Sequence, residues 1–377
     1  MLSWLIHFLL QIVPTLLILG VLIAIHELGH FIACRLSGVG VQKFSIGFGP
    51  ELFSFQGKRT RYSLSLIPIG GFVKPQGETE EDVKTRGKGE VEGDYLSAIV
   101  WRRIFIVVSG VAMNYLFAYL IFVMVLCMGR SITSAKIGKM IDGYPAQKSG
   151  LMLGDVVTRL NGKSVKDWQD LTFQLSKINT KQIEFSVRRS EEIKTIMVEP
   201  IYEQAPDMFG TKKQMPRVGI LPSSESVAIE KLKFPQATIE AARITANLAG
   251  LTYEALFRLF TGRMSIKSLS GPIVIVKMAG DVVKLGVDAV LQFTALLSIS
   301  LAVINLLPIP ALDGGHLVFL LIEWIFRRPV SIPVQERITT YGFYLLMVLM
   351  VVVFYNDLIN VGVVEKLKHL FMMLKPS

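Results

Sequence analysis

Long apolar runs with few charges alternate with polar segments along this chain. Four runs are long enough to cross a hydrocarbon layer of about 30 Å as helices. In order, they lie within Leu5–Cys34, Ile104–Met128, Ala289–Leu312 and Ile338–Asn356. We therefore predict a polytopic α-helical membrane protein with four transmembrane helices.

The polar segments between the runs differ in their patterns. Residues 36–100 include the alternating stretch Arg61–Ile67, which is typical of half-buried strands, so we predict a β-rich, membrane-associated loop. Residues 225–286 contain Ile244, Leu248 and Leu251 at helical spacing, which predicts amphipathic helices on the outer membrane surface. The predicted division assigns transmembrane helices to 1–35, 101–129, 287–314 and 338–357, an inserted domain with a trailing linker to 130–224, a connection to 315–337 and a tail to 358–377.

Composition supports a membrane protein rather than a nucleic-acid-binding one. Of the 377 residues, 51% are hydrophobic and 19% are charged, whereas soluble domains average about 25% charged residues. The net charge of +10 comes from scattered Lys and Arg, which fit loops lying against anionic lipid, so we predict a lipid bilayer and no nucleic acid as partner. Cys34 and Cys127 both lie at the ends of apolar runs and predict no disulfide framework.

Basic residues indicate the orientation in the membrane. Lys and Arg flank the ends of the apolar runs on the loops that follow the first and third runs, and none occurs before Arg35. The positive-inside rule then places the N-terminus outside, loops 36–100 and 315–337 in the cytoplasm, and the long segment 130–286 outside. The residues used are Arg35, Lys43, Arg102, Arg103, Arg327, Arg328 and Arg337.

The outer segment includes a small α+β domain at 136–200. Residues 146–163 resemble the core of a PDZ domain, and Asn161-Gly162 within them is a strong two-residue hairpin signal. A short helix is expected at Asp167–Lys177, followed by strands at 183–189 and 195–198. One PDZ copy is present. Its groove either accepts an extended peptide as an added strand or acts as a steric plug or spacer without a ligand.

The first apolar run carries a metal-binding pattern, His26-Glu27-Leu28-Gly29-His30. On a helix, His26 and His30 project from one face, so both imidazoles can reach one metal ion. Glu27 lies beside them and can handle the proton of an activated water. Glu27 is the only charged residue between Leu5 and Cys34, and an ionisable group inside a span usually marks function.

A catalytic zinc site needs a third protein ligand. Asp313 is the only acidic residue between Ala289 and Glu323 and follows the third run, where the prolines disrupt helix. Irregular backbone at membrane depth is tolerated only where it faces protein or water, as a ligand site would. His316 is a competing third ligand, or else a residue that supports Asp313.

These motifs resemble the site-2 protease family of intramembrane zinc metalloproteases. The likeness joins the HELGH motif, a PDZ-like insert and Asn305-Leu306-Leu307-Pro308-Ile309-Pro310-Ala311-Leu312-Asp313-Gly314-Gly315-His316 in the family's order. It implies that His26, His30 and Asp313 ligate Zn²⁺ and that Glu27 is the catalytic acid and base. It also implies that Asn305, Pro308 and Pro310 hold the substrate.

The resemblance further implies the reaction, its partners and its location. The expected activity is peptide hydrolysis in or near the spans of single-span membrane proteins, such as anti-sigma factors and remnant signal peptides. The expected location is the bacterial inner membrane, with the active site toward the cytoplasm and the PDZ-like domain periplasmic. A non-catalytic PDZ scaffold and a metal transporter are the alternatives; Glu27 favours catalysis over the scaffold, and a single HExxH motif supplies no transport path.

A membrane helix must unwind locally before its backbone can be cut. Each freed backbone group then needs a new hydrogen-bond partner in the hydrocarbon. A strand edge beside the site could supply those partners by strand addition. We take Arg61–Ile67 as the candidate edge, with a purely structural hairpin as the alternative.

Overall fold

The chain folds into two compact units. The computed structural model describes residues 2–78, 93–207, 211–223, 227–265 and 269–360. Unit 1 comprises Met1–Met124, Thr238–Glu254 and Leu269–Ser377, and unit 2 comprises Val125–Ala237 and Ala255–Ser268. The predicted tail at 358–377 lies outside the described residues from 361 onward.

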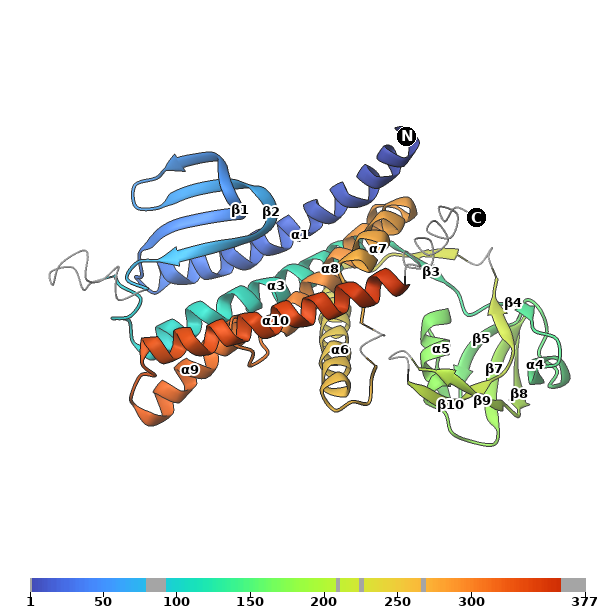
Figure 1. Ribbon diagram of the computed structural model, residues 1–377. Coiled ribbons are helices and arrows are strands. Elements are labelled where there is room, and N and C mark those ends of the chain that lie inside the picture. Colours follow the sequence, from blue (N-terminus) through green and yellow to red (C-terminus); the bar gives the residue numbers. More distant parts are fainter. Residues whose placement is uncertain (1, 79–92, 208–210, 224–226, 266–268, 361–377) are drawn as a thin grey trace, which may run out of the picture. The chain divides into compact units, whose positions relative to one another are not determined.

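Four helices among the described residues are long and apolar enough to cross a membrane. They correspond to the four predicted runs, so the expectation of a membrane protein with four such helices is confirmed (Figure 1). The helices are α1 (Leu2–Leu36), α3 (Val100–Met128), α8 (Val287–Asn305) and α10 (Ile332–Asn360).

The third helix is shorter than the sequence pattern predicted. It ends at Asn305 rather than extending through Leu312, because Pro308 and Pro310 lack the N–H that a continuing helix needs. A loop at 306–312 follows, and α9 (Asp313–Phe326) begins at the end of the predicted third span, 287–314, and continues into the predicted connection, 315–337. Asp313 is therefore the first residue of a new helix and not part of the third span.

A buried carboxylate joins two helices of unit 1. Asp357 of α10 accepts hydrogen bonds from the backbone N–H groups of Gly271 (2.9 Å), Ile273 (2.9 Å) and Val274 (3.2 Å) at the start of α7 (Pro272–Leu285). These N–H groups have no partner within their own helix, and the positive end of the helix dipole favours a carboxylate there. Asp357 thus holds the last turns of α10 against α7.

Strands β1 (Val41–Gln56) and β2 (Arg61–Pro75) form a bent sheet beside α1 (Figure 1). Residues 43–46 pair with 71–74 on one side and with 61–64 on the other, and 53–56 also pair with 61–64. The predicted free edge at Arg61–Ile67 is therefore wrong, because this segment is hydrogen-bonded on both sides over 61–64. Among the described strands, 71–75 pairs with 41–46 alone and forms one edge of the sheet, and 53–56 pairs with 61–64 alone and forms the other.

The expected membrane association of this sheet fits its surface. Phe53, Phe55 and Leu66 are more than half exposed, and a soluble protein seldom leaves so many large apolar side chains together in water. Membrane association of the sheet remains a prediction, and these side chains are the ones that would contact lipid.

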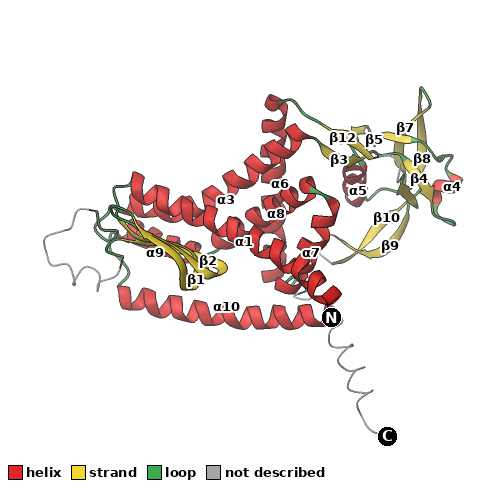
Figure 2. Ribbon diagram, turned by 90° about the horizontal axis from the view of Figure 1, so that it is seen from above, coloured by secondary structure: helices red, strands yellow, loops and turns green. Residues whose placement is uncertain are grey.

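Unit 2 contains a four-stranded sheet in the order β6-β5-β7-β8 (Figure 2). Its buried core includes Leu160, Leu171 and Phe185. The predicted turn is confirmed, since Asn161 and Gly162 both have positive φ between β5 and β6. The strands are β5 (Val156–Leu160), β6 (Lys163–Ser164), β7 (Ile183–Arg189) and β8 (Glu192–Val198).

Helix α5 (Trp168–Ser176) falls where the sequence predicted a short helix. The side chain of Asp167 accepts a hydrogen bond from the backbone N–H of Asp170 (2.8 Å), which caps the helix start. A single turn, α4 (Pro145–Lys148), precedes the sheet. The predicted α+β character of this domain is therefore present in its described elements.

Segments expected to be linker or helix form additional strands. Residues 201–224 were expected to form a linker or trailing strand. Their described part contains β9 (Ile201–Pro206), β10 (Lys212–Arg217) and β11 (Ile220–Pro222). Strand β9 pairs with β10, and β11 pairs with β4 (Ile137–Met140). The prediction of helix from 225 onward is wrong at its start, because β12 (Val227–Glu230) pairs with β3 (Arg130–Thr133) and α6 spans Phe234–Phe260. The alternating pattern at 227–230 covers four residues, so in the sequence prediction it was outweighed by the longer helical pattern that follows it.

Candidate metal centre

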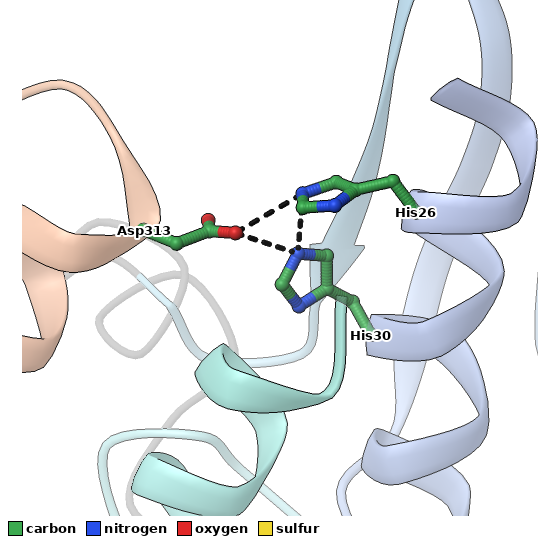
Figure 3. A group of neighbouring side chains, drawn as sticks. All are labelled: His26, His30 and Asp313. Carbon is green, nitrogen blue, oxygen red and sulfur yellow. Dashed lines mark hydrogen bonds and ion pairs between the residues drawn. The ribbon is translucent and has the colours of Figure 1, made fainter. Parts of the chain in front are cut away.

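Helix α1 places His26 and His30 one turn apart on the same face. His26 is buried and His30 is partly buried, and their Nε2 atoms lie 3.2 Å apart. Figure 3 shows the two imidazoles turned toward a common point rather than stacked. The spacing seen in the sequence thus produces two nitrogen ligands aimed at one position.

Asp313 approaches the same point from the start of α9 (Figure 3). Its Oδ2 lies 3.0 Å from His26 Nε2 and 3.4 Å from His30 Nε2. Within the described part of the chain, these three residues form the group of His, Cys, Asp and Glu side chains placed to hold a metal, with ligand atoms within 4.8 Å of one another. The structure therefore brings together the three predicted ligands.

The spacing of the three atoms fits zinc. A tetrahedral zinc site with bonds of about 2.0–2.1 Å separates its ligand atoms by roughly 3.3 Å. The observed separations of 3.0, 3.2 and 3.4 Å agree with that value. Asp313 Oδ2 is buried, faces the two imidazoles and accepts no hydrogen bond from any other group of the described chain. Two imidazoles and one carboxylate are also a donor set typical of catalytic zinc.

Helix α3 supports both histidines from behind. His30 Nδ1 lies 2.8 Å from the carbonyl oxygen of Ile106, and His26 Nδ1 lies 3.3 Å from the side-chain amide of Asn114. A histidine that binds metal through Nε2 carries its proton on Nδ1 and donates it to an acceptor. The Asn114 Oδ1 atom is buried without a partner, so a turn of the amide makes it that acceptor.

Asn114 and Gly110 are site residues that sequence analysis missed. A Cβ at Gly110 would overlap His30 Nε2 and would lie 2.9 Å from His26 Cε1, so only glycine leaves room for the imidazoles. Gly110 and Asn114 lie four residues apart on one face of α3. A small residue and an amide at that spacing single out this face of an uncharged span, but the pattern does not show that the face contacts the histidines.

Glu27 lies beside the edge strand of the β1–β2 sheet. Its carboxylate interacts with the backbone of Val73, and a Cβ at Gly71 would lie 3.2 Å from Glu27 Cγ. The strand edge at 71–75 therefore runs next to the predicted catalytic carboxylate. A cavity of about 680 Å³ is lined by Glu27, His30 and Asp313 and gives a substrate room beside them.

Of the predicted substrate-binding residues, Asn305 ends α8, and Pro308 and Pro310 lie on the loop between α8 and α9. Asn305 Nδ2 is 3.3 Å from His26 Nε2, so this amide reaches the metal position. Pro308 is exposed and Pro310 is partly buried. His316 lines the cavity but is not among the three converging ligands, so the geometry favours Asp313 as the third ligand.

Comparisons with known proteins agree with this geometry. A model of "Peptidase family M50" matches residues 14–349. A protein of Agrobacterium fabrum named "Putative zinc metalloprotease" is 35% identical over 92% of this chain and 95% of its own length. The "Regulator of sigma-W protease RasP" of Bacillus subtilis is 29% identical over 92% of this chain and 98% of its own.

A solved structure also matches a part of the chain. It is the PDZ domain of an SdrC-like protein from Listeria innocua, with 19% identity and a TM-score of 0.19, covering 24% of this chain and 92% of that domain. The family match spans most of the chain and includes all three converging ligands and Glu27. The chain belongs to peptidase family M50, whose relatives are named as zinc metalloproteases.

Proposed function

We propose that this chain is an intramembrane zinc protease that cuts peptide bonds in or near the transmembrane segments of single-span membrane proteins. The observation that carries the proposal is the position of the ligands. His26 and His30 lie within the apolar helix segment Gln11–Leu36, and they meet Asp313 beside a cavity. A hydrolytic metal site inside a span has membrane-embedded peptide as its natural substrate.

The chain's own residues divide the chemistry among them. His26, His30 and Asp313 would hold zinc, which when bound acts as a Lewis acid that activates water and polarises the scissile carbonyl. Glu27 accepts the proton of the attacking water and then passes it to the leaving nitrogen. The Asn305 amide is placed to donate a hydrogen bond to the substrate backbone or to the developing oxyanion.

The strand edge at 71–75 is suited to hold an unwound substrate. Its Val73 backbone already contacts Glu27, so a peptide added along this edge would pass the catalytic carboxylate. The added strand would satisfy backbone groups that unwinding exposes to hydrocarbon. This assigns to 71–75 the role first expected for 61–67.

The biological setting is part of the same proposal. We infer a bacterial inner-membrane location with the site toward the cytoplasm, because Arg35, Arg102 and Arg103 flank the corresponding ends of α1 and α3. Substrates of the anti-sigma-factor type and remnant signal peptides fit a site that accepts single spans. The "Regulator of sigma-W protease" among the relatives supports a regulatory substrate.

Cleavage by membranes that contain the chain tests the proposal. A tagged single-span substrate with a short outer domain is expected to be cut by the intact chain and spared by Glu27→Gln. The glutamine keeps the size of Glu27 but cannot accept the proton, and the zinc ligands remain, so zinc content should be unchanged. Equal cleavage by both would exclude Glu27 from the reaction, and a zinc-loaded chain that cuts no membrane substrate would support the scaffold alternative.

A further inference from the structure

Loop 306–312 connects Asn305 to Asp313 and so links the predicted substrate-binding residues to a metal ligand. Its backbone turns tightly, with the N–H of Ile309 donating to the carbonyl of Leu307 (2.7 Å) and that of Leu312 to the carbonyl of Ile309 (3.1 Å). Ala311 has a left-handed backbone, with φ of 78°. A residue with a Cβ adopts that conformation only where its surroundings impose it.

Two glycines from different helices pack against Pro310 in this loop. A Cβ at Gly315 of α9 would lie 2.8 Å from Pro310 Cα. A Cβ at Gly342 of α10 would overlap both Cβ and the carbonyl oxygen of Pro310. Pro310 is therefore held between two backbones that approach it as closely as glycine allows.

Gly342 is unusual within its own helix. In the most apolar window of α10, 6% of the residues are buried, compared with 28–44% in the other three candidate spans. The buried residues of α10 within the described chain are Gly342, Asn356 and Asp357. Gly342 and Asp357 are 15 residues apart, or roughly 22 Å along the helix, so α10 is fixed near the site by Gly342 and far from it by Asp357.

We propose that Gly342 is a positioning residue for the metal centre. Through its contact with Pro310, α10 holds the loop in its turned shape and thereby fixes Asp313, three residues farther along, relative to His26 and His30. The two histidines are held independently by α1 and α3. A methyl group at 342 must displace Pro310, and with it the carboxylate but not the imidazoles.

The proposal rests on the zinc site of the proposed function, not on any substrate. It is tested by zinc affinity of the full-length chain in detergent, measured by competition with a chelator of known affinity. Gly342→Ala should weaken zinc binding by about 10–100-fold, the range seen when outer groups that orient ligands are lost. The matched control is Gly250→Ala on α6, a helical glycine with open space where the Cβ would stand, which should bind zinc as the wild type does.

The outcomes separate the two proposals. Folded Gly342→Ala protein with wild-type zinc affinity overturns the positioning role, as does an equal loss in Gly250→Ala. A wild-type chain that binds no zinc contradicts the proposed function itself. If Gly342→Ala does not fold, Pro310→Gly replaces it, because this change removes the Cβ that Gly342 contacts and frees the loop backbone. Weakened zinc binding by Pro310→Gly then supports the positioning role, and wild-type zinc affinity overturns it.

Discussion

At the scale of single residues, the centre depends on groups that orient the ligands as much as on the ligands. His26 and His30 contact α3 through their Nδ1 atoms, which leaves both Nε2 atoms facing Asp313. The partner of His30 is a backbone carbonyl, whereas that of His26 is the Asn114 side chain, which mutation can change. Asn114 is also completely buried, so its substitution acts on the site from within the protein.

Replacement of Asn114 should therefore weaken metal binding. Asn114→Leu removes the acceptor for the His26 Nδ1 proton, and we expect zinc affinity to fall by about 10–100-fold. Asn114→Asp keeps an acceptor oxygen of the same reach and should lose much less. Chelator competition on the two purified variants measures the difference, and equal affinities would exclude this role for Asn114.

A second residue-scale prediction concerns pH and unit 2. Burial of the Asp155 carboxylate raises its pKa, but hydrogen bonds from the Arg189 guanidinium and the Met152 N–H outweigh that effect and hold the pKa below its usual value. A carboxylate with a lowered folded-state pKa stabilises the fold above its unfolded pKa of about 3.9 and loses that contribution as the pH falls through its folded value.

We expect the stability advantage of wild type over Asp155→Asn to be full near pH 7 and to shrink below about pH 4. Hydrogen exchange of strands β5 and β7 in the full-length chain reports on unit 2 alone. A difference between the two proteins that stays constant from pH 7 to pH 3 would show that this ion pair does not govern the pH dependence.

The sequence was most informative about residues whose relationships are local. The histidine pair could be predicted because four residues make one helical turn, and Asp313 because it is the only acid between Ala289 and Glu323. Asn114 and Gly342 could not, since each acts on a residue more than 30 positions away in the chain. Their roles depend on how α3 and α10 pack, which no local pattern records.

At the scale of elements, the breaks in regular structure create the site. The third run is apolar through Leu312, yet the prolines end α8 at Asn305 and a new helix starts at Asp313. The strand pattern at 61–67 was correct, but its place within the sheet was not, because pairing is decided by long-range register. Edge 71–75 instead lies beside Glu27.

An edge that accepts substrate as a strand requires an unwound substrate helix. Glycine or asparagine placed near the scissile bond of the substrate span should therefore speed cleavage relative to leucine, because these residues destabilise the helix. Initial rates for a matched series of substrates in vesicles would measure the effect. The same substitutions near an end of the span, away from the scissile bond, serve as controls. Cleavage rates that do not change with the stability of the substrate helix would argue against unwinding.

At the scale of the whole molecule, the inserted unit suggests a role in choosing substrates. Strands β3 and β12 pair where the chain enters and leaves this insert, so residues 134–226 can be replaced by a short linker while both strands remain. If the PDZ-like domain screens the outer part of substrates, this deletion should allow spans with long outer domains to be cut. Comparison of substrates with short and long outer domains gives the selectivity, and unchanged selectivity would leave the domain as a spacer.

The central claim is that His26, His30 and Asp313 support peptide hydrolysis within the membrane. Mass spectrometry of the fragments from a single-span substrate, cut by the purified chain in vesicles, identifies the bond directly. We predict a scissile bond inside the substrate's apolar span, with both fragments absent when Glu27→Gln replaces the wild type. A bond in a water-exposed segment outside the span, or fragments that persist with Glu27→Gln, would contradict the claim.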